Sequence, residues 1–309
     1  MANIIKDYKS LIGNTPIFEI CNIERELNLK AKVLIKLENM NPGGSIKDRA
    51  SLYMIEKAIQ EGTITKDTII MEATSGNTGI GAAAVCASLN LRCIIIMPEG
   101  MSEERIKIMK QLGAQVILTE KSLGMAGSIK KLDELKKEFK DYFVLNQFAN
   151  ESNSLAHYET TAKEIYEDCD GKIDYFISAV GTSGTIMGCS KYFKEKNKGI
   201  KVIAVEPSES AVLNKEKANI HKIQGIGAGF IPKLFDYKFV DGIEKANYVE
   251  AIAASKLLAR KEGILVGISS GASLSVALKY AGENDNEGKT IVVILPDSAS
   301  RYYSTELFD

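Results

Sequence analysis

Residues 174–195, DYFISAVGTSGTIMGCSKYFKE, contain the pattern on which the fold class rests. Asp174–Val180 is almost entirely apolar, which is typical of a strand that is buried on both faces of a parallel sheet. A turn rich in glycine and hydroxyl groups follows it, and the residues from Gly184 onward have a helical pattern. The segment therefore predicts a strand, a tight turn and a helix in succession.

The same alternation recurs along the chain and predicts a doubly wound α/β fold with helices on both faces of its sheets. The length of 309 residues corresponds to about two domains. The Asn-rich segment Asp141–Ser154 indicates a boundary near residue 150, so we expect domains at 1–150 and 151–309. The other expected strands are Lys32–Leu37, Thr68–Glu72, Arg92–Met97, Gln115–Leu118, Val202–Glu206 and Thr290–Leu295. The expected helices are Ile46–Glu61, Asn77–Asn90, Ser102–Leu112, Ala126–Phe139, Ser154–Asp168, Gly184–Glu195, Tyr248–Glu262 and Ser269–Ala281.

The composition narrows the class of protein. Apolar residues make up 45% and charged residues 26%, as in ordinary globular proteins, and the net charge is −1. This balance argues against a nucleic-acid or membrane surface. The first nine residues lack a targeting segment, and five cysteines without CxxC spacing predict reduced thiols in a cytoplasmic protein. His157 and His221 are the two histidines, so we expect no His-rich metal site and interpret both as structural.

The turn from Val180 to Thr185 is predicted to bind phosphate. Its small residues allow several backbone N–H groups to point into one concavity, and the following helix adds partial positive charge. The alternative is a tight turn that needs glycine for its geometry alone, but so many hydroxyl groups exceed that requirement. The GK[ST] ending of a Walker A loop is absent.

Two further glycine-rich turns are expected at the carboxyl ends of strands, where ligands of α/β proteins bind. The turn from Glu72 to Gly79 could form a nest for a carboxylate, or Ser75 or Asn77 could simply cap the following helix. The turn from Gly267 to Gly271 is, by itself, explained by a serine N-cap.

Lys47 is the candidate reactive group, because it lies in the first turn of an expected helix. The helix dipole disfavours a cation there, which favours an amine that acts as a nucleophile or forms a Schiff base. The alternative is a solvated lysine compensated by Asp48. Taken together, a phosphate site, a carboxylate nest and a poised lysine predict the cofactor pyridoxal 5′-phosphate and an amino-acid substrate.

The sequence resembles the cysteine synthase (O-acetylserine sulfhydrylase) and cystathionine β-synthase family, whose fold is shared with tryptophan synthase β. The resemblance extends from the motif IGNTP at residues 12–16 to RYYSTELF at residues 301–308. It implies two doubly wound three-layer domains, a piece at about 87–131 that moves to close over the substrate, and an active-site mouth lined by Gly225–Phe230.

The resemblance also implies residue roles. Lys47 would hold the cofactor as a Schiff base and act as the catalytic base, Asn77 would bond the pyridoxal 3′-oxygen, and Ser269 would meet the ring nitrogen. The phosphate would be bound by Gly181, Thr182, Ser183, Gly184 and Thr185, and the substrate carboxylate by Thr74, Ser75, Thr78 and Gln147.

The implied reaction is a β-replacement through α-aminoacrylate, in which O-acetyl-L-serine and sulfide give L-cysteine and acetate. An alternative keeps the cofactor but uses L-cysteine as donor, releasing hydrogen sulfide and forming lanthionine or cystathionine. A dehydratase or threonine synthase, and a non-catalytic binding module, are further alternatives. The resemblance also implies a homodimer and a possible complex with the C-terminal tail of serine acetyltransferase.

Overall fold

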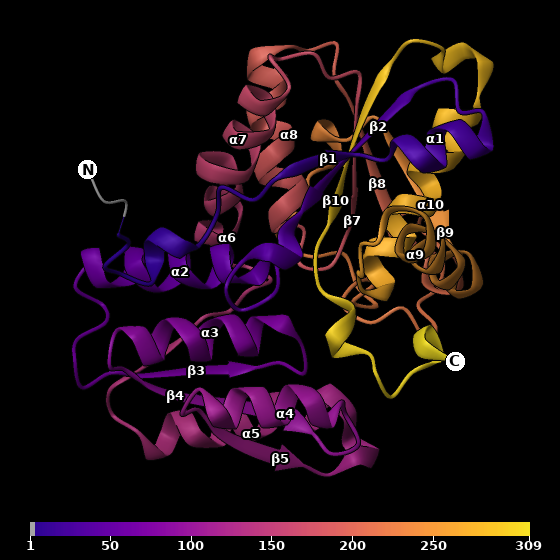
Figure 1. Cartoon of the computed structure of the whole chain (residues 1–309). Coiled ribbons are helices and arrows are strands. Elements are labelled where there is room, and N and C mark those ends of the chain that lie inside the picture. The colour runs from indigo at the N-terminus through magenta and orange to yellow at the C-terminus, as the bar shows by residue number, and fades with distance from the viewer. Residues whose placement is uncertain (1–3) are drawn as a thin grey trace. The chain divides into compact units, whose positions relative to one another are not determined.

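The computed structural model describes residues 4–309, which alternate between strands and helices (Figure 1). The strands are β1 (Ile17–Glu19), β2 (Lys32–Leu37), β3 (Ile69–Ala73), β4 (Arg92–Pro98), β5 (Gln115–Thr119), β6 (Tyr142–Val144), β7 (Tyr175–Ala179), β8 (Lys201–Pro207), β9 (Gly242–Ala246) and β10 (Thr290–Leu295). The helices are α1 (Cys21–Leu27), α2 (Lys47–Gln60), α3 (Asn77–Ser88), α4 (Glu103–Gln111), α5 (Gly124–Glu138), α6 (Glu151–Ala156), α7 (Ala162–Asp168), α8 (Gly184–Lys196), α9 (Tyr248–Glu262) and α10 (Ile268–Gly282).

The chain forms two compact units with a sheet in each. The first unit comprises residues 4–12 and 41–153, and the second comprises residues 13–40 and 154–309. The sheet of the first unit is parallel, in the order β5-β4-β3-β6. The sheet of the second unit has the order β1-β2-β10-β7-β8-β9, and β1 is its antiparallel edge strand. The prediction of an α/β fold with doubly wound sheets is confirmed.

Side-chain alternation along β3 places apolar groups on both faces of the first sheet. Ile69 and Met71 pack against Leu132 and Leu135 of α5. Ile70 belongs to the cluster on the opposite face, which α2, α3 and α4 cover. These three layers bury strands that have few polar side chains, as the sequence predicted.

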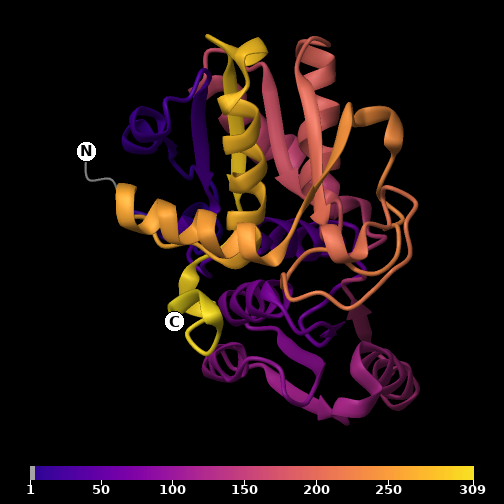
Figure 2. The same cartoon turned by 90° about the vertical axis from the view of Figure 1, so that its right-hand side faces the viewer.

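The second unit is also built in layers. Phe176 of β7 makes an edge-to-face contact with Phe193 of α8, with 5.1 Å between the ring centroids. Ile177, the next residue, faces the core formed with α9 and α10. Figure 2 shows α10 lying along this sheet. Pairing of β2 with β10 explains why residues 13–40 belong to this unit although they lie between the two segments of the first unit in sequence.

The expected strands and helices all occur, with ends that differ by a few residues. The expected helix at Ser154–Asp168 is interrupted by a π-helical turn at His157–Thr161. Three strands and α1 lie outside the expectations. All three are edge strands. The strands β1 and β6 are only three residues long, and β9 contains Gly, Glu and Lys, so none has the long apolar run that identifies a central strand.

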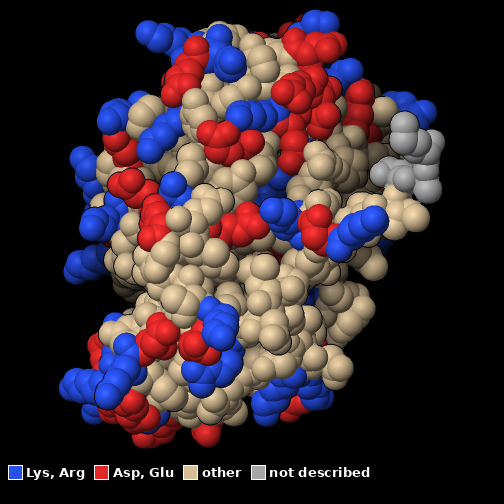
Figure 3. Space-filling model, turned by 90° about the vertical axis from the view of Figure 1, so that its left-hand side faces the viewer, with Lys and Arg blue, Asp and Glu red and all other residues tan. Residues whose placement is uncertain are grey.

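The distribution of surface charge and the composition of the helices bear on the kind of environment that the protein contacts. On the face drawn in Figure 3, Lys and Arg side chains are interspersed with Asp and Glu side chains. No helix among residues 4–309 combines the length and the apolar composition needed to cross a bilayer.

Candidate active site

The first unit brings the predicted carboxylate-binding residues together at one point of its sheet. The strand order reverses between β3 and β6, and such switch points are where α/β sheets bind ligands. Thr74, Ser75 and Thr78 follow β3, and Gln147 follows β6. The hydroxyl of Thr78 donates to Oε1 of Gln147 over 2.6 Å, and both side chains are buried. The two loops thus form one site.

The loop after β3 leads directly into α3, and hydrogen bonds to Thr74 and Ser75 hold it. Thr74 Oγ1 accepts from the N–H of Gly76 over 3.3 Å, and Arg105 donates to the carbonyl of Ser75 over 3.4 Å. The N-cap of α3 is Gly76, which has no side chain to bond the first helical N–H groups. Capping by Ser75 or Asn77, one of the two interpretations of this turn, is therefore wrong, and these N–H groups can bind an anion.

Lys47 is the first residue of α2, as the sequence predicted, and it is half-buried. The carboxylate of Asp48 accepts from the N–H of Gly43 over 2.6 Å, which holds the preceding turn. A Cβ at Gly81 of α3 would lie 2.9 Å from the carbonyl oxygen of Lys47. This close helix packing places the start of α2 beside α3, the helix that carries Asn77 and Thr78.

The turn predicted to bind phosphate, Val180–Thr185, lies in the second unit where the strand order reverses between β7 and β10. We call this turn the cup. Ser183 is the N-cap of α8 and has a φ of 72°, a left-handed conformation that is uncommon outside glycine. Its Oγ is buried and has no hydrogen-bond partner among the described residues. A Cβ at Gly181 would lie 2.5 Å from the carbonyl oxygen of Gly225, so only glycine fits there.

His157 supports this cup, a role that the sequence did not reveal. The ring is fully buried, with Nδ1 2.9 Å from Oγ1 of Thr161 and Nε2 3.3 Å from Oγ1 of Thr185. It lies in the π-helical turn, a distortion that often accompanies functional sites. The interpretation of His157 as a structural residue agrees with these contacts, which hold a hydroxyl group of the cup.

The turn at Gly267–Gly271 was expected to follow a strand and to contain a serine N-cap, and the structure shows neither feature. Val266 forms an isolated bridge with Ser298, so the turn does not follow a strand. The N-cap of α10 is Gly267, and Ser269 lies inside the helix, so the serine N-cap is wrong. A Cβ at Gly225 would lie 3.9 Å from Oγ of Ser269. Ser269, Gly225 and Gly181 therefore lie close together in the second unit.

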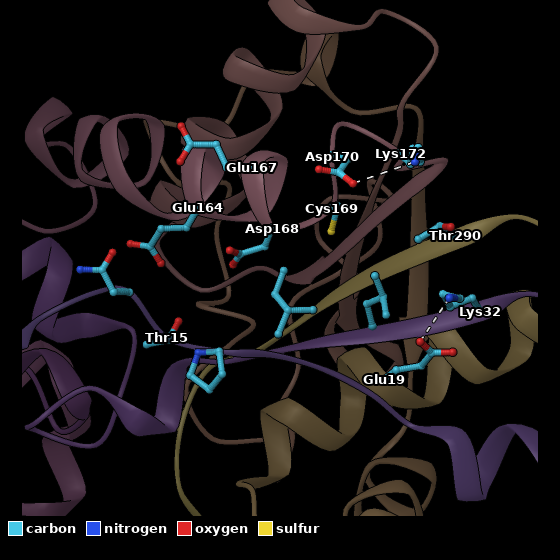
Figure 4. A pocket seen from close by; sticks show the side chains of 14 residues that line it. Thr15, Glu19, Lys32, Glu164, Glu167, Asp168, Cys169, Asp170, Lys172 and Thr290 are labelled. Carbon is cyan, nitrogen blue, oxygen red and sulfur yellow. Dashed lines mark ion pairs between the residues drawn. The ribbon is translucent and has the colours of Figure 1, made fainter.

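A cavity of about 710 Å³ lies elsewhere in the second unit, and none of the predicted site residues lines it (Figure 4). Glu164 and Asp168 are among its walls. The ammonium group of the buried Lys36 lies 2.9 Å from Glu164 and 3.5 Å from Asp168, and it donates to the carbonyl of Thr15 over 2.6 Å. The ammonium group of Lys36 therefore neutralises part of the acidic lining of this cavity.

Glu72, at the end of β3, is a second residue whose importance the sequence did not reveal. Its side chain is buried, and its carboxylate accepts from the N–H groups of Asn146 and Gln147 over 2.9 and 3.4 Å. Burial raises the pKa of Glu72 from 4.5 to about 7, although these N–H groups, the Gln147 side chain and Lys136 lower it. A carboxylate in an otherwise apolar strand is the signal that could have identified it.

This raised pKa predicts a pH dependence of stability. Between pH 4.5 and 7 the folded protein retains a proton on Glu72 that the unfolded chain releases. The stabilising contribution is therefore complete below pH 4.5 and is lost as the pH rises through 7, amounting to roughly 3 kcal/mol. Urea titrations across this range are expected to show the decline in wild type and a smaller one in Glu72→Gln. Equal slopes in both proteins would contradict the assignment.

Comparison with known proteins identifies the class to which this fold and these sites belong. The family described as pyridoxal-phosphate dependent enzyme matches residues 8–297. The match covers more than half of the chain, so the chain belongs to this family.

Three relatives narrow the comparison. A cysteine synthase of Buchnera aphidicola subsp. Schizaphis graminum is 47% identical over 100% of this chain and 97% of the relative. The crystal structure of a cysteine synthase from Entamoeba histolytica has a TM-score of 0.96 and 44% identity, covering 99% of this chain and 91% of the other. A hydrogen sulfide-producing enzyme from Fusobacterium nucleatum has a TM-score of 0.92 and 48% identity, covering 98% and 100%.

The residues of the cup fit the phosphate of this family's cofactor. A phosphate offers acceptor oxygens, and the cup offers the buried Oγ of Ser183, without a partner among the described residues, beside the N-terminus of α8. Gly181 keeps the loop free of a side chain where the backbone at Gly225 approaches. The enzyme is thus of the cysteine synthase type and depends on pyridoxal phosphate.

Proposed function

We propose that the protein is a cysteine synthase that converts O-acetyl-L-serine and sulfide into L-cysteine and acetate. The observation that carries the proposal is the 47% identity with a cysteine synthase over the whole chain. The linked loops after β3 and β6 support it, because an amino-acid substrate needs a site for its carboxylate.

We assign roles in this chemistry to the residues that the family resemblance implies. When bound, pyridoxal phosphate supplies the electron sink that makes the Cα proton of an amino acid removable. Lys47 holds the cofactor covalently, and its freed amine accepts the Cα proton as acetate leaves. Asn77 bonds the 3′-oxygen of the cofactor, and the hydroxyl of Ser269 meets the ring nitrogen. Gly181, Thr182, Ser183, Gly184 and Thr185 bind its phosphate.

Thr74, Ser75, Thr78 and Gln147 bind the carboxylate in this proposal. Replacing Thr78 with valine removes the hydroxyl that joins the two loops but keeps the shape of the side chain. We expect the KM for O-acetylserine to rise about 10-fold, with cofactor content unchanged, because one hydrogen bond to a charged group is lost. Steady-state kinetics with a cofactor absorbance check measure this. An unchanged KM would remove Thr78 from the carboxylate site.

A second candidate function uses L-cysteine as the donor and releases hydrogen sulfide. The specific observation in its favour is the 48% identity with the hydrogen sulfide-producing enzyme of Fusobacterium nucleatum. Initial rates of cysteine formation from O-acetylserine and sulfide, compared with sulfide release from cysteine with and without a second thiol, distinguish the two. We expect the first reaction to be faster, and faster turnover of cysteine would favour the second function.

The proposal extends to assembly and location. We propose a cytoplasmic homodimer, in which residues 87–131 close over the substrate and Gly225–Phe230 line the mouth that could admit the C-terminal tail of serine acetyltransferase. The free state of all five cysteines supports a reducing compartment. Light scattering of the purified protein, alone and with the tail peptide, tests the assembly, and a monomer that ignores the peptide would contradict it.

A further inference from the structure

Glu72 connects two loops that come from distant parts of the sequence. It pairs with Ile95 on one side of β3, and its two carboxylate oxygens reach the chain just beyond β6 on the other. The side chain is only 4% exposed. Burying an ionisable group in such a place costs folding free energy unless hydrogen bonds compensate for the lost water.

The segment that Glu72 bonds is a strained turn. Asn146 has a φ of 52°, in the left-handed region. Its carbonyl oxygen accepts from the N–H groups of Ala149 and Asn150, each over 2.9 Å. The two N–H groups at the start of the turn, those of Asn146 and Gln147, have the Glu72 carboxylate as their acceptor. Without that acceptor the buried N–H of Gln147 would lose its partner, and so would the part-buried N–H of Asn146.

The same turn presents Gln147 to the carboxylate site. Its backbone carbonyl accepts from Nδ2 of Asn153 over 2.8 Å, and its side-chain oxygen accepts from Thr78 over 2.6 Å. The amide group of Gln147 also lies close enough to Glu72 to stabilise the ionised carboxylate. Above pH 7, where Glu72 is ionised, its carboxylate accepts but does not donate, so it selects the orientation in which the NH₂ faces Glu72 and the oxygen faces Thr78.

We propose that Glu72 is a positioning residue that fixes both the backbone and the amide orientation of Gln147, and so sets the affinity for the carboxylate of the amino-acid substrate. The inference rests on the proposed function, because it assigns Gln147 and Thr78 to carboxylate binding. Glu72 acts from behind the site, through Gln147.

Two explanations of Glu72 predict opposite changes in the KM for O-acetylserine when its charge is removed. If Glu72 acted only through its negative charge, its removal beneath an anion site would tighten substrate binding and lower the KM. If Glu72 positions Gln147, Glu72→Gln raises the KM for O-acetylserine about 10-fold and leaves kcat within about twofold. A lowered or unchanged KM overturns the proposal.

Glu206→Gln is the matched control in the second unit. Glu206 is 1% exposed, and it accepts from the N–H groups of Leu213 and Asn214 over 2.8 and 2.9 Å, so it loses an equivalent interaction when neutralised. We expect it to lower the melting temperature without reproducing the change in KM. An equal rise in KM in both variants would show a general loss of structure and overturn the proposal.

A double-mutant cycle separates positioning from a merely structural role. In a Gln147→Ala background, Glu72→Gln should change the KM by less than about twofold, because the residue through which Glu72 acts is absent. Additive effects overturn the proposal.

If Glu72→Gln folds poorly, Glu72→Asp carries the same expectation. The shorter side chain keeps the charge but moves the carboxylate oxygens away from the N–H groups of Asn146 and Gln147. An unchanged KM in Thr78→Val removes Thr78 from the carboxylate site and so contradicts the assignment on which this inference rests. A raised KM in Thr78→Val together with an unchanged KM in Glu72→Gln contradicts only this inference.

Discussion

Replacing Lys47 with alanine is expected to lower turnover by on the order of 10⁴-fold and to abolish covalent attachment of the cofactor. The side chain begins α2, half-buried, beside the helix that carries Asn77 and Thr78. In the proposed function it supplies both the Schiff-base nitrogen and the acceptor of the Cα proton. Borohydride reduction followed by mass spectrometry measures the attachment, and steady-state assays measure the turnover.

Lys57→Ala is the matched control for this prediction. Lys57 lies on the same helix, where it forms an exposed ion pair with Glu61, so its loss should change activity by less than about twofold. The cofactor label should remain on Lys47 in this variant. A label found on another lysine of the wild-type enzyme, or a Lys47→Ala variant with normal turnover, would rule out the assignment.

Replacing Gly181 with alanine is expected to weaken cofactor binding by about 10- to 100-fold. The new Cβ would meet the carbonyl oxygen of Gly225 at 2.5 Å, and both are backbone positions that can separate only by moving the cup or its neighbouring loop. Overpacking of this kind costs about 1–3 kcal/mol. Titration of the cofactor-free protein with pyridoxal phosphate, followed by absorbance, measures the affinity.

Gly282→Ala controls for the general effect of adding a methyl group in the second unit. Gly282 ends α10, and no heavy atom beyond its immediate neighbours lies within 4 Å of the added Cβ. Its affinity for the cofactor should equal that of wild type. The steric explanation fails if Gly181→Ala binds the cofactor normally, or if both variants lose affinity equally.

Much of the fold and site followed from local patterns. The apolar runs at Lys32–Leu37 and Thr290–Leu295 coincide with β2 and β10, because a strand buried on both faces must be apolar throughout. Lys47 was placed correctly at a helix start because Pro42 and two glycines end the preceding segment. The turn at Val180–Thr185 was predicted to bind phosphate because small residues and hydroxyl groups occur there at high density.

The remaining features depend on contacts between distant residues. Glu72 gains its role from Asn146 and Gln147, and His157 gains its role from Thr185. The residues that neighbour Glu72 and His157 in sequence give no indication of these partners. The short edge strands β1, β6 and β9 exist because a neighbouring strand supplies their hydrogen bonds.

The sequence by itself therefore determined which chemical groups are present and which segments become helices and central strands. It did so because helix propensity and runs of apolar residues are properties of neighbouring positions in the chain. The tertiary structure alone establishes which loops meet at the reversal of strand order, and that residues 13–40 join the C-terminal sheet. Strand pairing brings together groups far apart in the chain, and burial then alters their chemistry. Glu72, whose pKa rises to about 7 once it is enclosed, shows both effects.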